Sequence, residues 1–399
     1  MKKKLTGIFF FLFVLSSPAI FGNEQTAVWQ RIYQNSVNDE MRYAVLLNIQ
    51  ELRDTGFTDL LTQALSSLLM RGIESGNLQD VEMKVKLATL LVRQLGQFHA
   101  TTAADEVFQV YQEVKEHPFL KAEAAMALGE MHATDDVPYL VRSLNDLNLA
   151  PNPRNAEAQE ILAFGLVQSL ALMHDPRGYE PVFYASIGWY GPERKVKETA
   201  RKLLKTMVPD PTDSLIKIIK SQTNFKNMRY ALQAEDDSHA PDASKSRAAL
   251  VALSQGVKFI ANGVEQSLDL ATLRAKALQM LIAEKDHSEA AVALYRQDYK
   301  TARLAKQTDE VLTVIQALGV NGTASAASYL AELLNNFNTE FNNGLTLSDF
   351  QLQELKTVLW AMQLAKNPTV RPALLEAQFL YTPAIQDDVK AVLASLPTN

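Results

Sequence analysis

Apolar residues repeat with the period of an α-helix along almost the whole chain, and this pattern limits the fold more than any other feature. Clear examples are Met41, Val45, Ile49 and Leu52, then Val81, Val85, Ala88, Val92 and Leu95, then Leu352, Leu355, Leu359 and Met362. Spacings of three and four residues place such side chains on one face of a helix. We find no convincing run in which apolar and polar residues alternate, as a half-buried strand requires. The sequence therefore predicts an all-α fold.

Proline residues indicate where many of these helices begin. An amphipathic stretch follows Pro138, Pro153, Pro181, Pro192, Pro211, Pro368 and Pro383. Proline suits the first helical turn because its missing N–H needs no partner there and its φ is already helical. We expect helices of roughly 12 to 20 residues, joined by short turns, as in antiparallel neighbours.

Four segments share one arrangement, in which a helix ends on an apolar pair, a few polar residues follow, and a second apolar helix begins. These segments are residues 126–146, 170–188, 316–336 and 360–379. Their spacing fits a period of about 40 residues with two helices in each unit, as in HEAT or armadillo arrays. The most regular unit contains Ala127, Leu128 and Gly129, then Asp135 or Asp136, followed by Val137, Pro138, Leu140 and Leu144.

On these residues the chain resembles the HEAT-repeat family, and residues 117–149 match it best. The resemblance implies a right-handed α-solenoid of about eight to nine HEAT-like helix pairs, in which the second helices line a concave face. HEAT arrays generally hold other macromolecules on that face. The resemblance therefore implies a protein or peptide partner, with exposed Tyr, Arg and Asn side chains on the second helices.

The first 22 residues have the pattern of a secretory signal peptide. Three lysines at positions 2–4 precede an apolar run at residues 8–15, and small residues follow before Asn23. The alternative is a short membrane anchor, but a spanning helix needs about 20 apolar residues and this run is far shorter. We predict cleavage near Ala19 or Gly22, which would leave a periplasmic or secreted chain with no membrane insertion.

A chain of 399 residues is too long for one ordinary core, since such cores stop growing at about 250 to 300 residues. The polar segment 235–244 interrupts the helical pattern and contains Pro241. We therefore expect an N-terminal HEAT-like array at 23–234, a loop or hinge at 235–244, and a C-terminal array at 245–399. The alternative for 235–244 is an ordinary surface loop.

Composition excludes several kinds of partner and site. The formal net charge of −6 argues against nucleic acid as the partner. The chain has no cysteine, which excludes disulfides, thiolate metal sites and cysteine nucleophiles. Common catalytic motifs are absent, and Ser214 with Lys217 forms only an isolated Ser-x-x-Lys. No two histidines stand three or four residues apart, so we predict no metal site and no cofactor.

Two of the histidines occupy equivalent places in the repeat. His132 and His174 each follow an apolar helix end, directly before the second helix of a unit. We interpret this as a preference of the turn rather than as a pair of metal ligands.

Aromatic and arginine side chains are the candidates for partner binding, because these residue types dominate interface energetics. The candidates are Tyr139, Arg142, Tyr184, Trp189, Tyr190 and Arg194. The alternative for the aromatic cluster at 184–190 is core packing between neighbouring units.

These observations favour an exported HEAT-repeat scaffold that binds a protein or peptide on its concave face without catalysis. One alternative is an enzyme of the HEAT-like lyase type, which needs a polar catalytic cluster in a deep pocket. The other is a cell-envelope glycan binder, which needs stacked Trp and Tyr on one face. The three tryptophans, at positions 29, 189 and 360, are widely separated and give the glycan binder little support.

Overall fold

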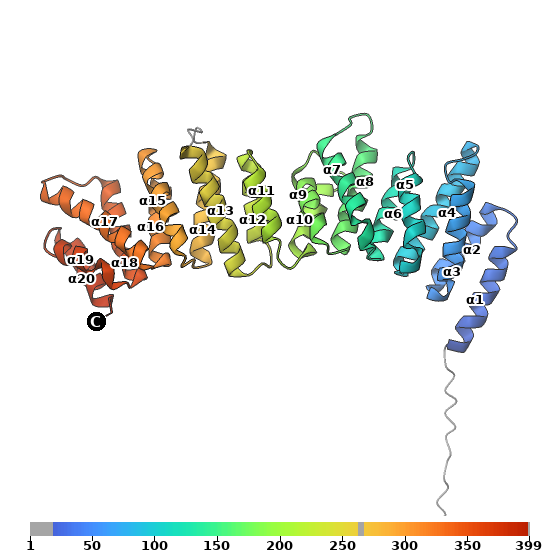
Figure 1. The fold of residues 1–399 in the computed structure, drawn as a ribbon, viewed down its shortest axis with the longest axis horizontal. Helices are drawn as coiled ribbons and strands as arrows, with labels where there is room; N and C mark the ends of the chain where they lie inside the picture. The colour runs from blue at the N-terminus through green and yellow to red at the C-terminus, as the bar shows by residue number, and fades with distance from the viewer. Residues whose placement is uncertain (1–18, 262–266, 398–399) are drawn as a thin grey trace, which may run out of the picture. The chain divides into compact units, whose positions relative to one another are not determined.

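The structure, a computed structural model, describes residues 19–261 and 267–397 of the chain (Figure 1). Within these ranges the chain folds into α-helices joined by turns and short 3-10 helices, and it forms no β-strand. The predicted all-α class is therefore confirmed. Most of the predicted signal peptide lies outside the described residues. Within the described ranges, no helix combines the length and the apolar character that a membrane span requires.

The described chain divides into two compact units. Unit 1 runs to Met173 and includes Gly191–Val196, and unit 2 comprises His174–Tyr190 and the residues from Lys197 onward. This division does not coincide with the predicted hinge, because residues 235–244 lie within unit 2.

The connection between helices in the segment 235–244 is also shorter than the predicted loop. A helix ends at Asp236 and the next begins at Asp242. Ser244 Oγ donates a hydrogen bond to Asp210 Oδ2 over 2.8 Å, which ties the start of the second helix to an earlier turn of the same unit. The segment is therefore a bonded turn inside unit 2.

Unit 1 is built from two rows of helices. Its helices are α1 (Ala19–Gln34), α2 (Asp39–Leu52), α3 (Thr58–Arg71), α4 (Leu78–Gln97), α5 (Ala104–Glu113), α6 (Pro118–Glu130), α7 (Val137–Leu149) and α8 (Ala156–Leu172). Helices α2, α4, α6 and α8 contact one another in sequence, and α3 contacts α5. Each even-numbered helix also contacts the odd-numbered helix just before it. Each even-numbered helix thus packs against its neighbours in the same row and against the odd-numbered helix before it.

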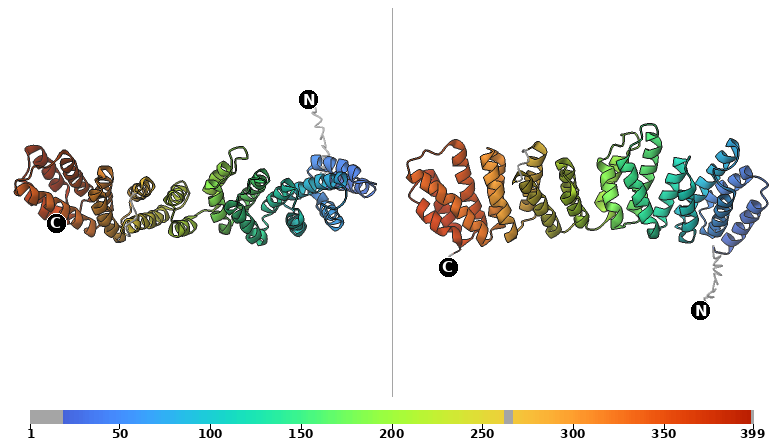
Figure 2. Two further views of the ribbon diagram at one scale, coloured as in Figure 1. Left: turned by 90° about the horizontal axis from the view of Figure 1, so that it is seen from above. Right: turned by 45° about the horizontal axis from the view of Figure 1, so that its top comes forward.

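Unit 2 repeats this arrangement over a longer stretch. Its helices are α9 (Tyr179–Ile187), α10 (Val196–Met207, whose first residue belongs to unit 1), α11 (Thr212–Ser221), α12 (Phe225–Asp236), α13 (Asp242–Ala261), α14 (Leu268–Ala283), α15 (Glu289–Leu304), α16 (Thr308–Asn321), α17 (Ala324–Asn342), α18 (Asp349–Ala365), α19 (Arg371–Ala377) and α20 (Pro383–Ser395). The contacts run from α12 through α14, α16 and α18 to α20, and from α9 through the odd-numbered helices to α19 (Figure 2).

Glycines let the even-numbered helices of unit 1 approach one another closely. A Cβ atom at Gly129 would lie 2.6 Å from the Cα atom of Ser169, and one at Gly165 would lie 2.7 Å from the carbonyl oxygen of Ala122. Contacts this short with backbone atoms leave no room for a side chain. Helices α6 and α8 therefore pack almost backbone to backbone, and Leu128 is completely buried beside them.

Histidines close the turns between helices of the two rows. His132 and His174 both adopt the left-handed backbone conformation, with φ of 53° and 52°. His174 Nδ1 lies 2.9 Å from the carbonyl oxygen of Met207, and His287 Nδ1 lies 2.9 Å from that of Asn321. Carbonyl groups at a helix end lack a partner within the helix, so an N–H at this ring nitrogen satisfies one of them. These histidines thus occupy turns, as the sequence indicates, and two of them stabilise the end of a following helix.

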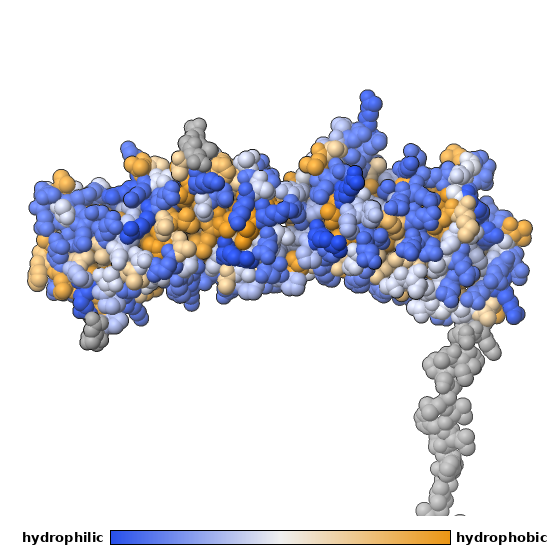
Figure 3. Space-filling view, in the orientation of Figure 1, coloured by the Kyte–Doolittle hydropathy of each residue, from blue (hydrophilic) through white to orange (hydrophobic). Residues whose placement is uncertain are grey.

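Unit 2 contains a fully buried ionic cluster that joins α14, α15 and α16. Arg274 Nε and Nη2 donate hydrogen bonds to the two carboxylate oxygens of Glu310, over 2.9 and 2.8 Å. Arg274 Nε also lies 2.8 Å from Asp298 Oδ1. Gly256 on α13 leaves room for the arginine stem, because a Cβ atom there would lie 2.6 Å from Arg274 Cγ. At the surface of unit 2, by contrast, polar residues surround apolar patches over α12 to α14 (Figure 3).

Asp298 is the strained member of this cluster. Burial raises the pKa of its carboxyl group to about 7, and the negative charge of Glu310 adds to this effect while Arg274 opposes it. Apart from the ion pair between its Oδ1 atom and Arg274, the carboxylate of Asp298 has no hydrogen-bond partner in the described part of the chain. Because the folded-state pKa lies above the ordinary value of 3.8, the folded chain binds this proton more tightly than the unfolded chain. The resulting stability is complete below about pH 4 and is lost as the pH rises through 7.

We predict that Asp298→Asn changes this pH dependence. The free energy of unfolding of the native chain should fall between pH 4 and pH 8. The variant has no ionising group at position 298, so its free energy of unfolding should lack this fall. At about 1.4 kcal/mol per unit of pKa shift, the variant should gain on the order of 2–4 kcal/mol relative to the native chain over this range. Urea denaturation followed by circular dichroism measures both profiles. Asp309→Asn, at an exposed neighbouring carboxylate, is the control, and parallel profiles for Asp298→Asn and the native chain would contradict the account.

Candidate binding site

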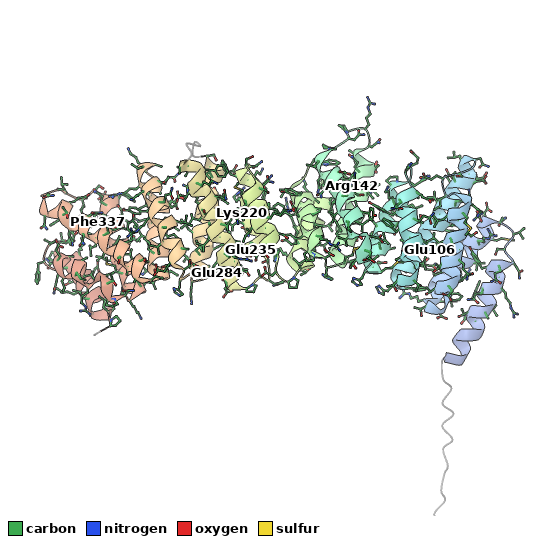
Figure 4. The ribbon with its side chains drawn as sticks, viewed as in Figure 1. Glu106, Arg142, Lys220, Glu235, Glu284 and Phe337 are labelled. Atoms are coloured by element: carbon green, nitrogen blue, oxygen red, sulfur yellow. The ribbon has the colours of Figure 1, made fainter. Side chains whose placement is uncertain are left out.

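Two of the predicted binding residues lie at the surface of unit 1 on α7. The side chain of Tyr139 is 55% exposed, and its ring centroid lies 5.1 Å from that of Phe108 on α5. Arg142 is exposed one turn further along the same helix and is labelled in Figure 4. The structure therefore places this pair where a partner can reach it.

Arg194 also belongs to unit 1 and is exposed. Its guanidinium group donates a hydrogen bond to the carboxylate of Glu157, at the start of α8. An exposed pair of this kind adds little stability, with a typical value of about 0 to 1 kcal/mol. Arg194 can therefore exchange this partner for another carboxylate.

The aromatic cluster of unit 2 is divided between core and surface. Tyr190 is completely buried, with its ring centroid 4.5 Å from that of the half-buried Trp189. A side chain without exposed surface does not reach a partner, so Tyr190 is not a binding residue and the core-packing alternative holds for it. Tyr184 is half-buried, and its hydroxyl oxygen accepts a hydrogen bond from Gln222 Nε2 over 2.8 Å.

An open hollow with the expected residue types lies between α15 and α17 in unit 2. Its volume is about 530 Å³. It is lined by Tyr299, Lys300, Arg303 and Leu304 from α15 and by Tyr329, Glu332, Leu333 and Asn336 from α17. On each helix these residues are three or four positions apart or adjacent, so they share one face. We refer to this hollow as the Tyr–Arg pocket.

Two tyrosines form the floor of the Tyr–Arg pocket. The rings of Tyr299 and Tyr329 meet edge to face, with their centroids 5.9 Å apart, and both residues are buried. The guanidinium of Arg296 lies 4.5 Å from the centroid of the Tyr329 ring, and that of Arg303 lies 5.9 Å from that of Tyr299. A guanidinium over an aromatic face is attracted to it, which holds both arginines in place.

A buried carboxylate behind the pocket fixes Tyr299. Glu354 on α18 is completely buried and accepts a hydrogen bond from the Tyr299 hydroxyl. Burial raises the pKa of Glu354, although the hydrogen bond from Tyr299 and the charge of Arg303 act in the opposite direction. Arg303 Nη2 lies 3.5 Å from Glu354 Oε2. Burial also raises the pKa of Tyr299, so its hydroxyl stays protonated as the donor.

Helix α17 has an exposed face at the rim of the pocket and a buried face in the core. Asn336 is exposed at the rim, whereas the next residue, Phe337, is buried in the row of odd-numbered helices (Figure 4). Glu332 is exposed and lies 3.5 Å from Arg296. The outer face of α17 is therefore polar, and only Leu333 contributes an aliphatic side chain to the lining from this helix.

Sequence reasoning missed the residues of this pocket, although a signal was present. The segment 295–303 places tyrosines and basic residues three or four positions apart, on one face of α15. That is the pattern of exposed Tyr and Arg that the scaffold hypothesis expects. The candidates instead came from the most regular repeat and from the cluster at 184–194.

No protein-family model matches this chain, and no curated protein is similar to it in sequence. Among the residues that the structure describes, no group of three or more His, Asp and Glu side chains could hold a metal ion.

We predict that Tyr299→Phe destabilises unit 2 because it leaves the buried carboxylate of Glu354 without its hydroxyl donor. A buried polar group that loses its partner costs about 1–3 kcal/mol. Urea denaturation should show this loss. The double variant Tyr299→Phe with Glu354→Leu should recover most of it, since no unpaired polar group then remains. Equal stability of Tyr299→Phe and the native chain would show that the hydrogen bond has no structural role.

Proposed function

We propose that this chain is an exported HEAT-like scaffold that binds a protein or peptide partner and has no catalytic role. The two rows of helices in each unit are the packing that a right-handed solenoid of about eight to nine helix pairs requires. In such an array α17 is a second helix, because residues 316–336 have the helix–turn–helix arrangement of one unit, and α15 contacts α17 in the same row. Their exposed face would then belong to the concave side.

The Tyr–Arg pocket is the observation that supports binding most strongly. Tyrosine and arginine dominate the energetics of protein interfaces, and here both types are held in fixed positions by ring contacts and by Glu354. Side chains that are already ordered lose less entropy when a partner binds. Tyr139, Arg142, Tyr184, Trp189 and Arg194 stay candidates for further contacts of the same kind.

Export is the second part of the proposal. It is supported by the basic residues at positions 2–4 and by the apolar run at 8–15. Cleavage near Ala19 or Gly22 would remove these segments and leave the helices from α2 onward intact.

We predict that the mature protein lacks its first 19 or 22 residues. Mass spectrometry of the protein purified from its source cells should find an N-terminal peptide that begins at Ile20 or Asn23. A protein that retains Met1 in the cytosolic fraction would contradict export.

We predict that one dominant protein partner crosslinks to the pocket. Crosslinking in the native envelope, followed by affinity purification and mass spectrometry, should recover it. The double variant Lys300→Ala with Asn336→Ala should reduce recovery about 5- to 10-fold, the loss expected when an interface contact worth more than 1 kcal/mol is removed. Both residues are exposed, so their replacement should leave the fold intact.

The matched control is Lys356→Ala with Gln363→Ala, which removes the same kinds of side chain from exposed positions on α18. Recovery from this control should equal that of the native chain. Equal losses in both double variants would contradict a specific site. Retention of a glycan or a small molecule without any protein partner would favour the glycan-binding or enzymatic alternative.

A further inference from the structure

We infer that the Tyr–Arg pocket recognises a carboxylate beside an apolar side chain, in an acidic and apolar segment of the partner. This inference rests on the proposed function, because it names the chemistry of the segment that the scaffold would hold. It depends on three features of the pocket, which are an unbalanced positive charge at its rim, ordered guanidinium groups and an adjacent apolar surface.

The rim of the pocket is positive in a chain that is acidic overall. Lys300 and Arg303 line the pocket, and Arg296 lies beside it, over the ring of Tyr329. The three residues stand four and three positions apart on α15, so their side chains share one face of the helix. The formal net charge of the whole chain is −6, so a cluster of three cations is an exception to its composition. A local positive field attracts anionic ligands and raises the rate at which they associate.

The carboxylates of unit 2 neutralise this cluster only in part. Glu332 lies 3.5 Å from Arg296, and the buried Glu354 lies 3.5 Å from Arg303. For Lys300, no carboxylate lies within ion-pair distance in the described part of the chain. The Glu354 carboxylate is buried behind Tyr299 and does not screen the rim from outside. The third cation therefore stays available for a ligand.

The arginines are ordered before any ligand arrives. The Tyr329 ring holds Arg296, and the Tyr299 ring together with Glu354 holds Arg303. A guanidinium matches a carboxylate with two parallel hydrogen bonds, and it loses less entropy when its position is already fixed. These contacts favour a planar carboxylate over a spherical anion, which would not use the paired donors.

An apolar side chain of the ligand finds a surface next to these charges. Leu304 is 87% exposed at the end of α15, and Leu333 lies in the wall of the pocket on α17. Asn336 offers an amide at the rim, which can donate to and accept from a peptide backbone. Charge, aliphatic surface and amide together fit a peptide, whereas a nucleic acid would require a broader basic surface.

We assign the carboxylate to an Asp or Glu side chain within the segment, and the test separates this source from a C-terminal carboxylate. Three fluorescein-labelled probes distinguish these sources. The first is Leu-Phe-Asp-Glu-Leu-Phe with an amidated C-terminus, the second is Leu-Phe-Asn-Gln-Leu-Phe with an amidated C-terminus, and the third is this second peptide with a free C-terminal carboxylate. Fluorescence anisotropy measures the binding of each probe to the full chain.

We expect the Asp-Glu probe to bind about 10-fold more tightly than the neutral probe. Its affinity should fall when the salt concentration rises from about 50 to 300 mM, since salt screens exposed charges. Lys300→Gln should weaken this probe about 3- to 10-fold and leave the neutral probe unchanged. Lys356→Gln on α18 is the matched control and should have no effect.

Equal binding of the three probes, no binding of any, or tight binding of only the probe with the free C-terminus would overturn the inference. An unchanged affinity in Lys300→Gln would overturn it as well. The proposed scaffold function fails separately. If the crosslinked partner is lost with the pocket variant but its binding is insensitive to salt and to Lys300→Gln, the scaffold stands and the acidic ligand does not. If no partner depends on the pocket, the scaffold proposal itself is wrong.

Discussion

Contact between successive helices of the even-numbered row is the interaction on which the rest of each unit depends. A single helix pair exposes a broad apolar face, and only the neighbouring pair can cover it. Unit 1 achieves this by backbone approach, because Gly129 and Gly165 remove the side chains that would separate α6 from its neighbour. Unit 2 uses a buried ion cluster in addition, in which Arg274 joins α14 to α15 and α16. The odd-numbered helices are held in place by these contacts and are free to present side chains outward.

The Tyr–Arg pocket combines both roles in one place. Its floor belongs to the core, since Tyr299 donates to the buried Glu354 of α18, and its rim is exposed and basic. Changes at the floor therefore act on stability, and changes at Lys300 or Asn336 act on binding. This separation explains why arginines at the rim can be well ordered without being buried. It also makes the two kinds of effect distinguishable by experiment.

The helical period predicted the fold class well because it depends only on local spacing. The same spacing identified the turns at His132 and His174, which adopt the left-handed conformation. The spacing could not predict that Arg274 and Asp298 are buried. Charged residues are ordinarily exposed, and they are buried only where another helix supplies a partner of opposite charge. Tyr190 was chosen for its residue type, and its burial depends on packing that sequence distance does not reveal. The Tyr–Arg pocket was missed for the same reason, since its two walls, α15 and α17, are separated in the chain by the whole of α16.

Site-specific photo-crosslinking tests directly whether a partner binds between α15 and α17. A photoreactive benzoylphenylalanine is placed at position 336, at the rim of the pocket, and in a second protein at position 363, an exposed site on α18. After illumination in the source cells, we expect one discrete protein adduct from position 336 and none of that mass from position 363. An adduct from position 363 alone, or the same adducts from both positions, would contradict the claim that the partner binds between α15 and α17.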